Sequence, residues 1–403
     1  MNERSVGFSK TRLGRMADAM RAYVARGEMA GAVTLLCRRD EVHLEAVGVQ
    51  DLAAAAPMRR DTIFRIASMT KPVTAAAAMI LVEEARLRLD EPVDRWLPEL
   101  ANRKVLRAID STLDDTVPAA RPITLRDLLT FRVGIGAVMV FPDRYPIQKA
   151  MAELGLAPGP RPLPFSPDEF MDRVGRLPLI HQPGERWMYH TGSDILGVLI
   201  ARASGMSLGG FLKERIFEPL GMEDTGFSVP EAKLGRLATC YQGDPATGRL
   251  AVYDEARGGV WARPPVFESG GGGLVSTADD YLAFARMMLR HGRHGAERIL
   301  SRPAVEVMTS DQLTAEQKAA SPFVPGFWNT RGWGFGLSVI TRRDGVGLSP
   351  GSFGWDGGFS TSGFCDPREE MVGILLVQRM MASPTGFDFH RDFWTLACQA
   401  IDD

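Results

Sequence analysis

The sequence predicts a mixed α+β fold: an antiparallel sheet flanked by helices, built from both ends of the chain, with a mainly helical domain inserted between them. Three observations lead to this prediction. The chain opens with a helix and two β-rich runs, its middle is mostly helical with loops rich in proline and glycine, and short strands and glycine turns return after about residue 225. We therefore expect an α+β domain of residues 1–66 and 225–403 and a mainly helical domain of residues 67–224.

The N-terminal segment carries two different hydrophobic periods. Residues 9–26 place apolar side chains at helical spacing, and Gly27 follows as a C-terminal cap. Two β-rich runs, 32–37 and 42–49, then flank a short polar turn. This pattern predicts one helix followed by a β-hairpin.

The middle of the chain is dominated by helical signals. Thr124 stands where a cap is needed for a helix over 123–130. The proline-rich segment 137–168 also holds large apolar residues and is predicted to be a long ordered loop or lid. Further helices are predicted over residues 72–89, 193–204 and 208–220.

The last part of the chain alternates glycine turns with strands. A four-glycine turn at 270–273 precedes a predicted helix over 277–291. Apolar runs at 334–340 and 371–377 predict strands, and 389–401 predicts a closing helix.

Composition excludes several classes of protein. With 403 residues, 45% of them hydrophobic and 24% charged, the chain fits a globular class rather than a disordered or fibrous one. The formal net charge of -2 and the absence of a long basic tract argue against nucleic acid as a partner. No apolar run approaches the length needed to span a membrane, so no membrane association is expected.

The cysteines and the first residues bear on compartment and cofactors. The four cysteines are scattered and form no CxxC pair, so neither a zinc site nor a disulfide scaffold is expected. Residues 1–5 contain no apolar signal core. These observations predict a cytoplasmic protein with no metal and no cofactor. The four cysteines are Cys37, Cys240, Cys365 and Cys398.

A serine and a lysine three residues apart open the Ala-rich helix, in the segment Ser68-Met69-Thr70-Lys71. This spacing brings both side chains to one helix face. At a helix start, Ser68 lies among unpaired N–H groups, which favour a developing oxyanion. Lys71 can act as a base if burial lowers its pKa, whereas an arginine cannot. The alternative interpretation is a helix cap next to a surface lysine.

Two further segments carry groups suited to the same chemistry. Tyr189 lies in a loop just before the helix predicted from residue 193, where a tyrosine beside a lysine can relay protons. The glycine-rich segment 353–360 would let backbone N–H groups approach a ligand closely. Taken singly, these segments are equally consistent with a buried aromatic residue and a hairpin turn.

Together the motifs resemble the serine β-lactamase and penicillin-binding-protein superfamily, and most closely the class C β-lactamase-like esterases called family VIII carboxylesterases. Segments 123–130, 184–189 and 270–280 look like the same group, so the resemblance covers most of the chain. It implies a β-lactamase/transpeptidase-like fold and an acyl-enzyme mechanism without a cofactor. By this resemblance Ser68 is the acylated nucleophile, Lys71 is the motif lysine and Tyr189 is the catalytic tyrosine.

The resemblance also assigns the glycine-rich strand. Trp355, Asp356 and Gly357 match the third motif, which is Lys-Thr-Gly in the lactamases and commonly Trp-x-Gly in the esterases. The backbone N–H groups of Gly358 and Ser68 would then form the oxyanion hole. Which of the motif lysine and tyrosine takes the serine proton is left open.

Departures from the lactamase pattern favour esters as substrates. The tyrosine motif ends in Thr191 rather than asparagine, and Trp355 replaces the lysine that meets a substrate carboxylate. Losing that cation removes a charge-assisted bond of roughly 1.5–3 kcal/mol from a carboxylate-bearing lactam. We therefore expect a serine esterase acting on short-chain carboxylic esters, with Trp355, Asp356, Gly357, His190 and Thr191 at the substrate.

Alternatives remain open at this point. An acyltransferase or transesterase, a β-lactamase and a D-amino-acid peptidase share the same chemistry, and a non-enzymatic relative is a further alternative. The physiological ester and the oligomeric state are not predicted. Ser207 lies in a Gly-x-Ser-x-Gly segment but follows a helix rather than a strand, so we interpret it as a helix cap. Aromatic segments 138–141 and 322–328 are expected to wall an acyl or alcohol pocket.

Overall fold

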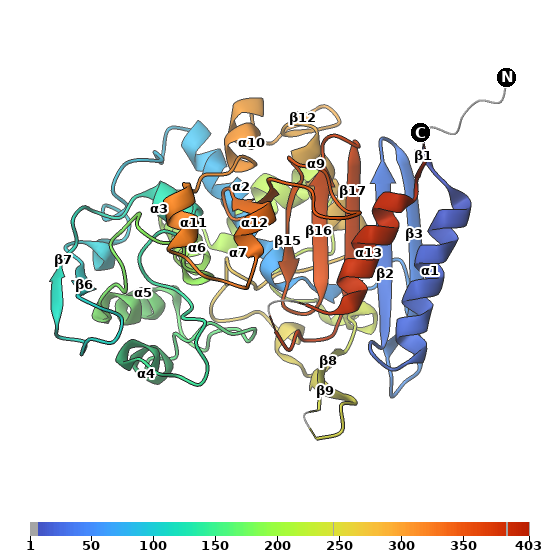
Figure 1. Cartoon of the computed structure of the whole chain (residues 1–403), viewed down its shortest axis with the longest axis horizontal. Helices are drawn as coiled ribbons and strands as arrows, with labels where there is room; N and C mark the ends of the chain where they lie inside the picture. The colour runs from blue at the N-terminus through green and yellow to red at the C-terminus, as the bar shows by residue number, and fades with distance from the viewer. Residues whose placement is uncertain (1–6, 245, 384–385, 403) are drawn as a thin grey trace.

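An eight-stranded antiparallel sheet is the largest sheet of the computed structural model, which describes residues 7–244, 246–383 and 386–402; in Figure 1 it lies on the right, with the mainly helical part on the left. The N-terminal residues 1–5, on which the signal-peptide expectation rests, lie outside these ranges. The strand order is β13-β14-β15-β16-β17-β2-β3-β4. Their bounds are β13 Arg331–Trp333, β14 Ser338–Ile340, β15 Phe353–Gly357, β16 Thr361–Asp366, β17 Met371–Val377, β2 Gly31–Arg38, β3 Glu41–Asp51 and β4 Ala56–Pro57.

The two ends of the chain meet in the middle of this sheet. Strand β17 pairs with β2 from Met371 opposite Arg38 to Val377 opposite Ala32. A short pair, β1 Gly7–Phe8 with β18 Ile401–Asp402, also joins the two ends. The prediction of an antiparallel sheet shared between the chain ends is confirmed.

The strands at the centre are buried on both faces, which explains their continuous apolar runs. In β2, Val33 and Leu35 belong to the larger core, whereas Ala32 and Leu36 belong to a second core on the opposite face. Helices α1 (Lys10–Ala25) and α13 (Asp388–Gln399) cover the second core and pack against each other (Figure 1). Helix α9 (Ala278–Leu289) packs on the other face.

The segment between residues 67 and 224 is mostly helical, as predicted. Thr124 caps α3: its side chain accepts from the Asp127 N–H while the Asp127 carboxylate accepts from the Thr124 N–H. The exact division of the chain into 1–66 with 225–403 and 67–224 stays a prediction. The helices are α2 Thr70–Glu83, α3 Leu125–Leu129, α4 Pro146–Glu153, α5 Pro167–Arg176, α6 Thr191–Ser204, α7 Leu208–Leu212 and α8 Glu218–Leu220, with a π-helical turn Lys213–Phe217 before α8 and a two-stranded sheet of β6 Lys104–Leu106 and β7 Thr116–Pro118.

Shorter elements complete the fold. Two-stranded sheets join β5 Phe64–Arg65 to β10 Val275–Ser276, β8 Cys240–Gly243 to β9 Leu250–Asp254, and β11 Arg293–His294 to β12 Glu297–Arg298. The remaining helices are α10 Arg302–Met308, α11 Ala315–Ala319 and α12 Phe327–Thr330.

Three predicted elements differ from the structure. Helix α2 ends at Glu83 rather than near 89, because the chain reverses at Ala85, whose φ is 57°. Only 338–340 of the predicted strand 334–340 is a strand, since Gly336 makes a turn in which an added Cβ would lie 2.9 Å from the Lys71 carbonyl oxygen. The predicted lid segment 137–168 is not all loop, because it contains α4 and the start of α5.

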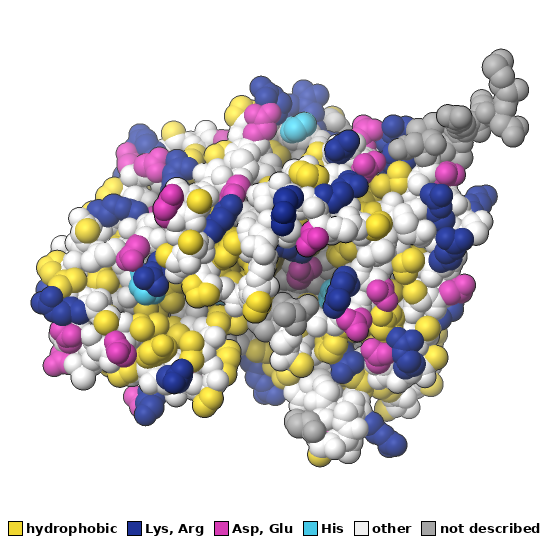
Figure 2. All heavy atoms as spheres, viewed as in Figure 1, with side chains coloured by type: hydrophobic (Ala, Val, Ile, Leu, Met, Phe, Trp, Pro, Cys, Tyr) yellow, Lys and Arg dark blue, Asp and Glu magenta, His cyan; other side chains and the backbone are white. Residues whose placement is uncertain are grey.

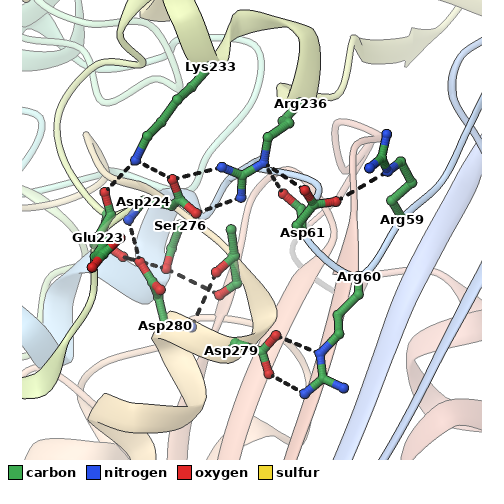
Figure 3. Close-up of polar contacts among 12 residues, drawn as sticks. Arg59, Arg60, Asp61, Glu223, Asp224, Lys233, Arg236, Ser276, Asp279 and Asp280 are labelled. Carbon is green, nitrogen blue, oxygen red and sulfur yellow. Dashed lines mark hydrogen bonds and ion pairs between the residues drawn. The ribbon is translucent and has the colours of Figure 1, made fainter.

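A polar network fixes the chain just before β5 (Figure 3). The guanidinium of Arg236 pairs with Asp224 at 2.5 Å and with Asp61 at 3.1 Å, while Arg60 donates two hydrogen bonds of 2.8 Å to Asp279 at the start of α9. The segment that leads into β5 is thus held to 224–236 and to α9.

Within the described residues, no single helix is long and apolar enough to cross a membrane. The bent pair Thr191–Ser204 and Leu208–Leu220 meets that criterion by length and composition only, and most of α6 is buried inside the protein.

Candidate active site

Ser68 lies in a short 3₁₀ turn, Ala67–Met69, between β5 and α2. Ala67 has a φ of 45°, a left-handed conformation that a non-glycine residue adopts only under strain. Surrounding contacts hold this turn: the Ile66 N–H donates to the Leu274 carbonyl at 3.0 Å, and the Thr361 hydroxyl donates to the Ile66 carbonyl at 3.0 Å. Ser68 itself is half-buried, and α2 begins two residues after it, at Thr70.

Lys71 is fully buried on the first turn of α2. Its Nζ lies 2.9 Å from Ser68 Oγ, 2.5 Å from the Gly271 carbonyl oxygen and 3.3 Å from His190 Nδ1. Burial lowers the pKa of Lys71 to about 7, against the opposing charge of Asp194. A substantial fraction of this amine is therefore neutral near pH 7 and able to accept a proton.

Tyr189 lies against both residues. Its ring centroid is 4.7 Å from Lys71 Nζ, and its Oη accepts a 2.7 Å hydrogen bond from Trp355 Nε1. Burial raises the pKa of Tyr189 to about 12, although hydrogen bonds with Ser68 and Trp355 lower it in part. The phenol is thus neutral at physiological pH and can pass a proton on without resting as a phenolate.

An aromatic cluster surrounds Tyr189. It includes Trp187, whose ring stacks on Tyr189 at 5.7 Å, and Trp355, whose ring lies 4.7 Å from that of Trp333. The predicted pocket segment 322–328 contributes to this cluster, whereas Phe141 of the segment 138–141 is 77% exposed. Its aromatic members, against which Leu313 also packs, are Phe131, Trp187, Tyr189, Phe323, Phe327, Trp328, Trp333 and Trp355.

The end of β15 packs against the turn that holds Ser68. At Gly357 an added Cβ would lie 2.4 Å from the Ile66 carbonyl oxygen, so only glycine allows this approach. At Gly358 an added Cβ would meet nothing within 4 Å, and its carbonyl accepts from the Met381 N–H at 2.9 Å. The backbone at Gly358 is thus fixed beside the serine turn with open space next to it.

His190 contacts Lys71 through one ring nitrogen and Asp194 through the other. Its Nε2 lies 3.0 Å from Asp194 Oδ2, and the other oxygen of Asp194 accepts from Ser269 Oγ at 2.6 Å and from the Gly271 N–H at 2.9 Å. Although burial raises the pKa of Asp194, these partners lower it overall, so the group is ionised. Sequence reasoning did not select Asp194, Ser269 or Gly271; the available signal was a histidine four residues before an aspartate, at the point where α6 begins.

Not all predicted site residues come together. Trp355 faces Tyr189, but the next side chain along the strand, Asp356, lines a cavity of about 450 Å³ together with residues of α13. Asp356 accepts a 2.6 Å hydrogen bond from Ser362 Oγ. Thr191 is 4% exposed as the first residue of α6. Ser207 does not join the site; it caps α7 by accepting from the Gly210 N–H at 3.0 Å, as predicted.

Figure 2 shows this face of the molecule hollowed near its middle, over the part of the sheet labelled β15 and β16 in Figure 1 and beside α13, where charged side chains gather. Among the described residues, no group of three or more His, Cys, Asp or Glu side chains is placed to hold a metal ion.

A serine and a buried lysine in contact at the start of a helix, with a tyrosine beside them and an antiparallel sheet carrying a helical segment, define a β-lactamase-fold serine hydrolase. The chain belongs to the Beta-lactamase family, whose model matches residues 16–392.

Individual relatives agree with this assignment. The chain is 40% identical over 358 residues to Protein Rv1367c of Mycobacterium tuberculosis, covering 87% of this chain and 86% of that protein. It is 31% identical over 377 residues to Esterase EstB of Burkholderia gladioli, covering 89% and 88%. EstCE1, described as a hydrolase with promiscuous acyltransferase activity, shares the fold with a TM-score of 0.78 at 24% identity, covering 97% of this chain and 98% of EstCE1.

These findings confirm the predicted resemblance, the fold class and the assignment as a serine hydrolase of the family VIII esterase type. The catalytic roles of individual residues stay proposals.

Proposed function

We propose that this serine esterase hydrolyses short-chain carboxylic esters through an acyl-enzyme on Ser68. The observation that carries the proposal is the 2.9 Å contact between Ser68 Oγ and the Nζ of Lys71, an amine whose pKa burial lowers to about 7. A serine becomes a nucleophile when an adjacent group takes its proton. Here that base is buried, in contact with the serine and partly neutral at working pH.

In the first half-reaction, Ser68 Oγ attacks the ester carbonyl while its proton passes to Lys71 Nζ. The carbonyl oxygen becomes an oxyanion, for which we assign the N–H groups of Ser68 and Gly358 as donors. The ester C–O bond then breaks, and the leaving alkoxide takes a proton that Lys71 supplies through the phenol of Tyr189. An acyl-enzyme and a free alcohol result.

In the second half-reaction, water attacks the acyl carbon and gives its proton to the neutral amine of Lys71. Breakdown of the tetrahedral intermediate releases the carboxylic acid and returns the proton to Ser68 Oγ. The pKa of Tyr189, raised to about 12 by burial, favours Lys71 as the resting base and Tyr189 as the proton carrier.

The surroundings of the serine support an uncharged, apolar ester. Trp355 stands where the lactamase motif has a lysine, and its indole is engaged with Tyr189 rather than free to bind a carboxylate. A carboxylate-bearing lactam would thus lack its usual cation here. Trp355, Gly357 and Thr191 are proposed to line the ester site; the side chain of Asp356 faces the α13 cavity instead.

Acyl transfer to an alcohol or amine is the second candidate. The description of EstCE1 favours it, because the same acyl-enzyme can be captured by an acceptor other than water. A β-lactamase or D-amino-acid peptidase activity is the weaker alternative. We further propose a cytoplasmic location, which the four free cysteines suit, and a small-molecule ester as the partner rather than nucleic acid or membrane.

The test is a panel of p-nitrophenyl esters of rising acyl length, assayed beside nitrocefin. We expect kcat/KM for butyrate to exceed that for nitrocefin by a wide margin, and a fluorophosphonate probe to label the wild-type protein but not Ser68→Ala. Hydrolysis of nitrocefin at or above the rate for butyrate would overturn the substrate assignment. Labelling of Ser68→Ala would overturn the nucleophile.

A further inference from the structure

We propose that His190, held by Asp194, is a positioning residue that keeps the lone pair of Lys71 directed at Ser68. This inference rests on the proposed function, because it gives the base of that reaction its orientation. This role differs from the one predicted from the sequence, in which His190 contacts the substrate.

The tautomer of His190 follows from its partners. Asp194 is ionised and carries only acceptor oxygens, so the 3.0 Å contact requires a hydrogen on His190 Nε2. In a neutral imidazole the other nitrogen, Nδ1, is then an acceptor. Asp194 is itself fixed by Ser269 Oγ and by the Gly271 N–H, so the ring cannot easily turn.

The hydrogen bonds of Lys71 complete the argument. A neutral amine has two N–H groups and one lone pair. The Gly271 carbonyl, at 2.5 Å, is an acceptor and takes one N–H, and His190 Nδ1, at 3.3 Å, takes the other. The lone pair is therefore left for the third neighbour, the hydroxyl of Ser68 at 2.9 Å.

The backbone supports a dedicated role for this residue. His190 has a φ of 80° and a ψ of -66°, in a region that costs a non-glycine residue conformational energy. This turn at the start of α6 directs the ring to Lys71 and Asp194. The adjacent glycine makes room for it, since a Cβ on Gly271 would lie 3.1 Å from the His190 ring.

The arrangement also predicts how pH dependence responds. Ser68, Tyr189, His190, Asp194 and the Gly271 carbonyl surround the amine, and Asp356 acts on Tyr189 from β15. His190 Nδ1 and the charge of Asp194 both stabilise the ammonium. Removing the acceptor of His190 or the charge of Asp194 lowers the pKa of Lys71. The acid limb of the pH profile of kcat/KM therefore moves to lower pH.

The test compares three variants in the full-length protein. In His190→Phe the ring remains but the acceptor is lost, so we expect the plateau kcat to fall roughly 10²-fold, with KM little changed and the acid limb moved to lower pH. In Asp194→Asn the amide can donate to Nε2 and reverse the tautomer, and we expect the same two changes. His190→Asn restores an acceptor near Nδ1, so we expect it to recover much of the activity.

His43→Phe, which alters a histidine on β3, serves as the matched control and should leave both kcat and the acid limb unchanged. Unchanged kcat and acid limb in His190→Phe would overturn the proposal. Equal losses in His190→Phe and His190→Asn, with the acid limb fixed, would overturn it as well, since they indicate a structural role alone. If His190→Phe does not fold, Asp194→Asn decides by the same two readouts. The esterase proposal itself is tested separately by Ser68→Ala, and it fails if that variant keeps its esterase activity.

Discussion

Replacing Lys71 by methionine should abolish turnover and yet stabilise the protein near neutral pH. Burial lowers the pKa of this lysine from 10.5 to about 7, so the folded protein disfavours the ammonium that the unfolded chain carries. A shift of this size corresponds to a destabilisation of about 4 kcal/mol at pH 7. Methionine has a similar length and carries no charge, so it removes this cost.

One loss opposes the gain. The Gly271 carbonyl, 2.5 Å from Nζ, loses its donor, and an unsatisfied buried acceptor costs about 1–3 kcal/mol. We therefore expect Lys71→Met to be about 2 kcal/mol more stable than the wild type at pH 7. Between pH 7 and 10.5 the unfolded chain binds one more proton at this site than the folded protein, so wild-type stability rises with pH relative to the variant, by up to about 1.4 kcal/mol per unit. The advantage should therefore be gone by about pH 9.

The assay is urea unfolding followed by tryptophan fluorescence, for both proteins at pH 7 and pH 9. Comparing the two proteins removes the contributions of other titrating groups, which they share. Lys149→Met, at an exposed position on α4, is the control and should show no such difference. An advantage for Lys71→Met that stays constant or grows from pH 7 to pH 9 would refute the reasoning.

Three further outcomes are expected. Ser207→Ala should keep full esterase activity and lose about 1 kcal/mol of unfolding free energy as a missing helix cap; a large loss of kcat would contradict this. Trp355→Phe removes the N–H that contacts Tyr189 Oη, so kcat/KM should fall about fivefold, and an unchanged value would show that this bond is not used. Asp254→Asn leaves the buried guanidinium of Arg65 without its charge partner, so urea unfolding should show a loss of about 3–5 kcal/mol; wild-type stability would count against it.

Local signals in the sequence were enough for much of the fold. The hairpin of β2 and β3 follows from two β-rich runs around a polar turn, and the cap at Thr124 follows from a threonine three residues before an aspartate. Ser68 and Lys71 come together because the 3₁₀ turn that holds Ser68 runs directly into α2, so that a spacing of three brings both side chains to one face. Only the family resemblance predicted that Tyr189 lies beside them, since Tyr189 belongs to a distant segment of the chain.

The remaining features depend on tertiary contacts that no local pattern encodes. Strand alternation separates Trp355 from Asp356, although the motif treats them as one unit. The ring of His190 reaches Lys71 because of one positive φ, and a histidine before a helix carries no signal for that. The turn at Gly336 exists because α2 packs against it, so its sequence alone resembles a strand.

The pairing of β17 with β2 has a consequence for protein synthesis. Residues 32–38 leave the ribosome long before their partners, residues 371–377, are made. Until then one edge of the nascent hairpin stays open, and such edges invite pairing with other chains. Closing a loop of this length is also slow relative to local contacts. Productive folding of the sheet is thus expected to wait until residues 371–377 have been made, with the nascent chain depending on chaperones to keep that edge from aggregating.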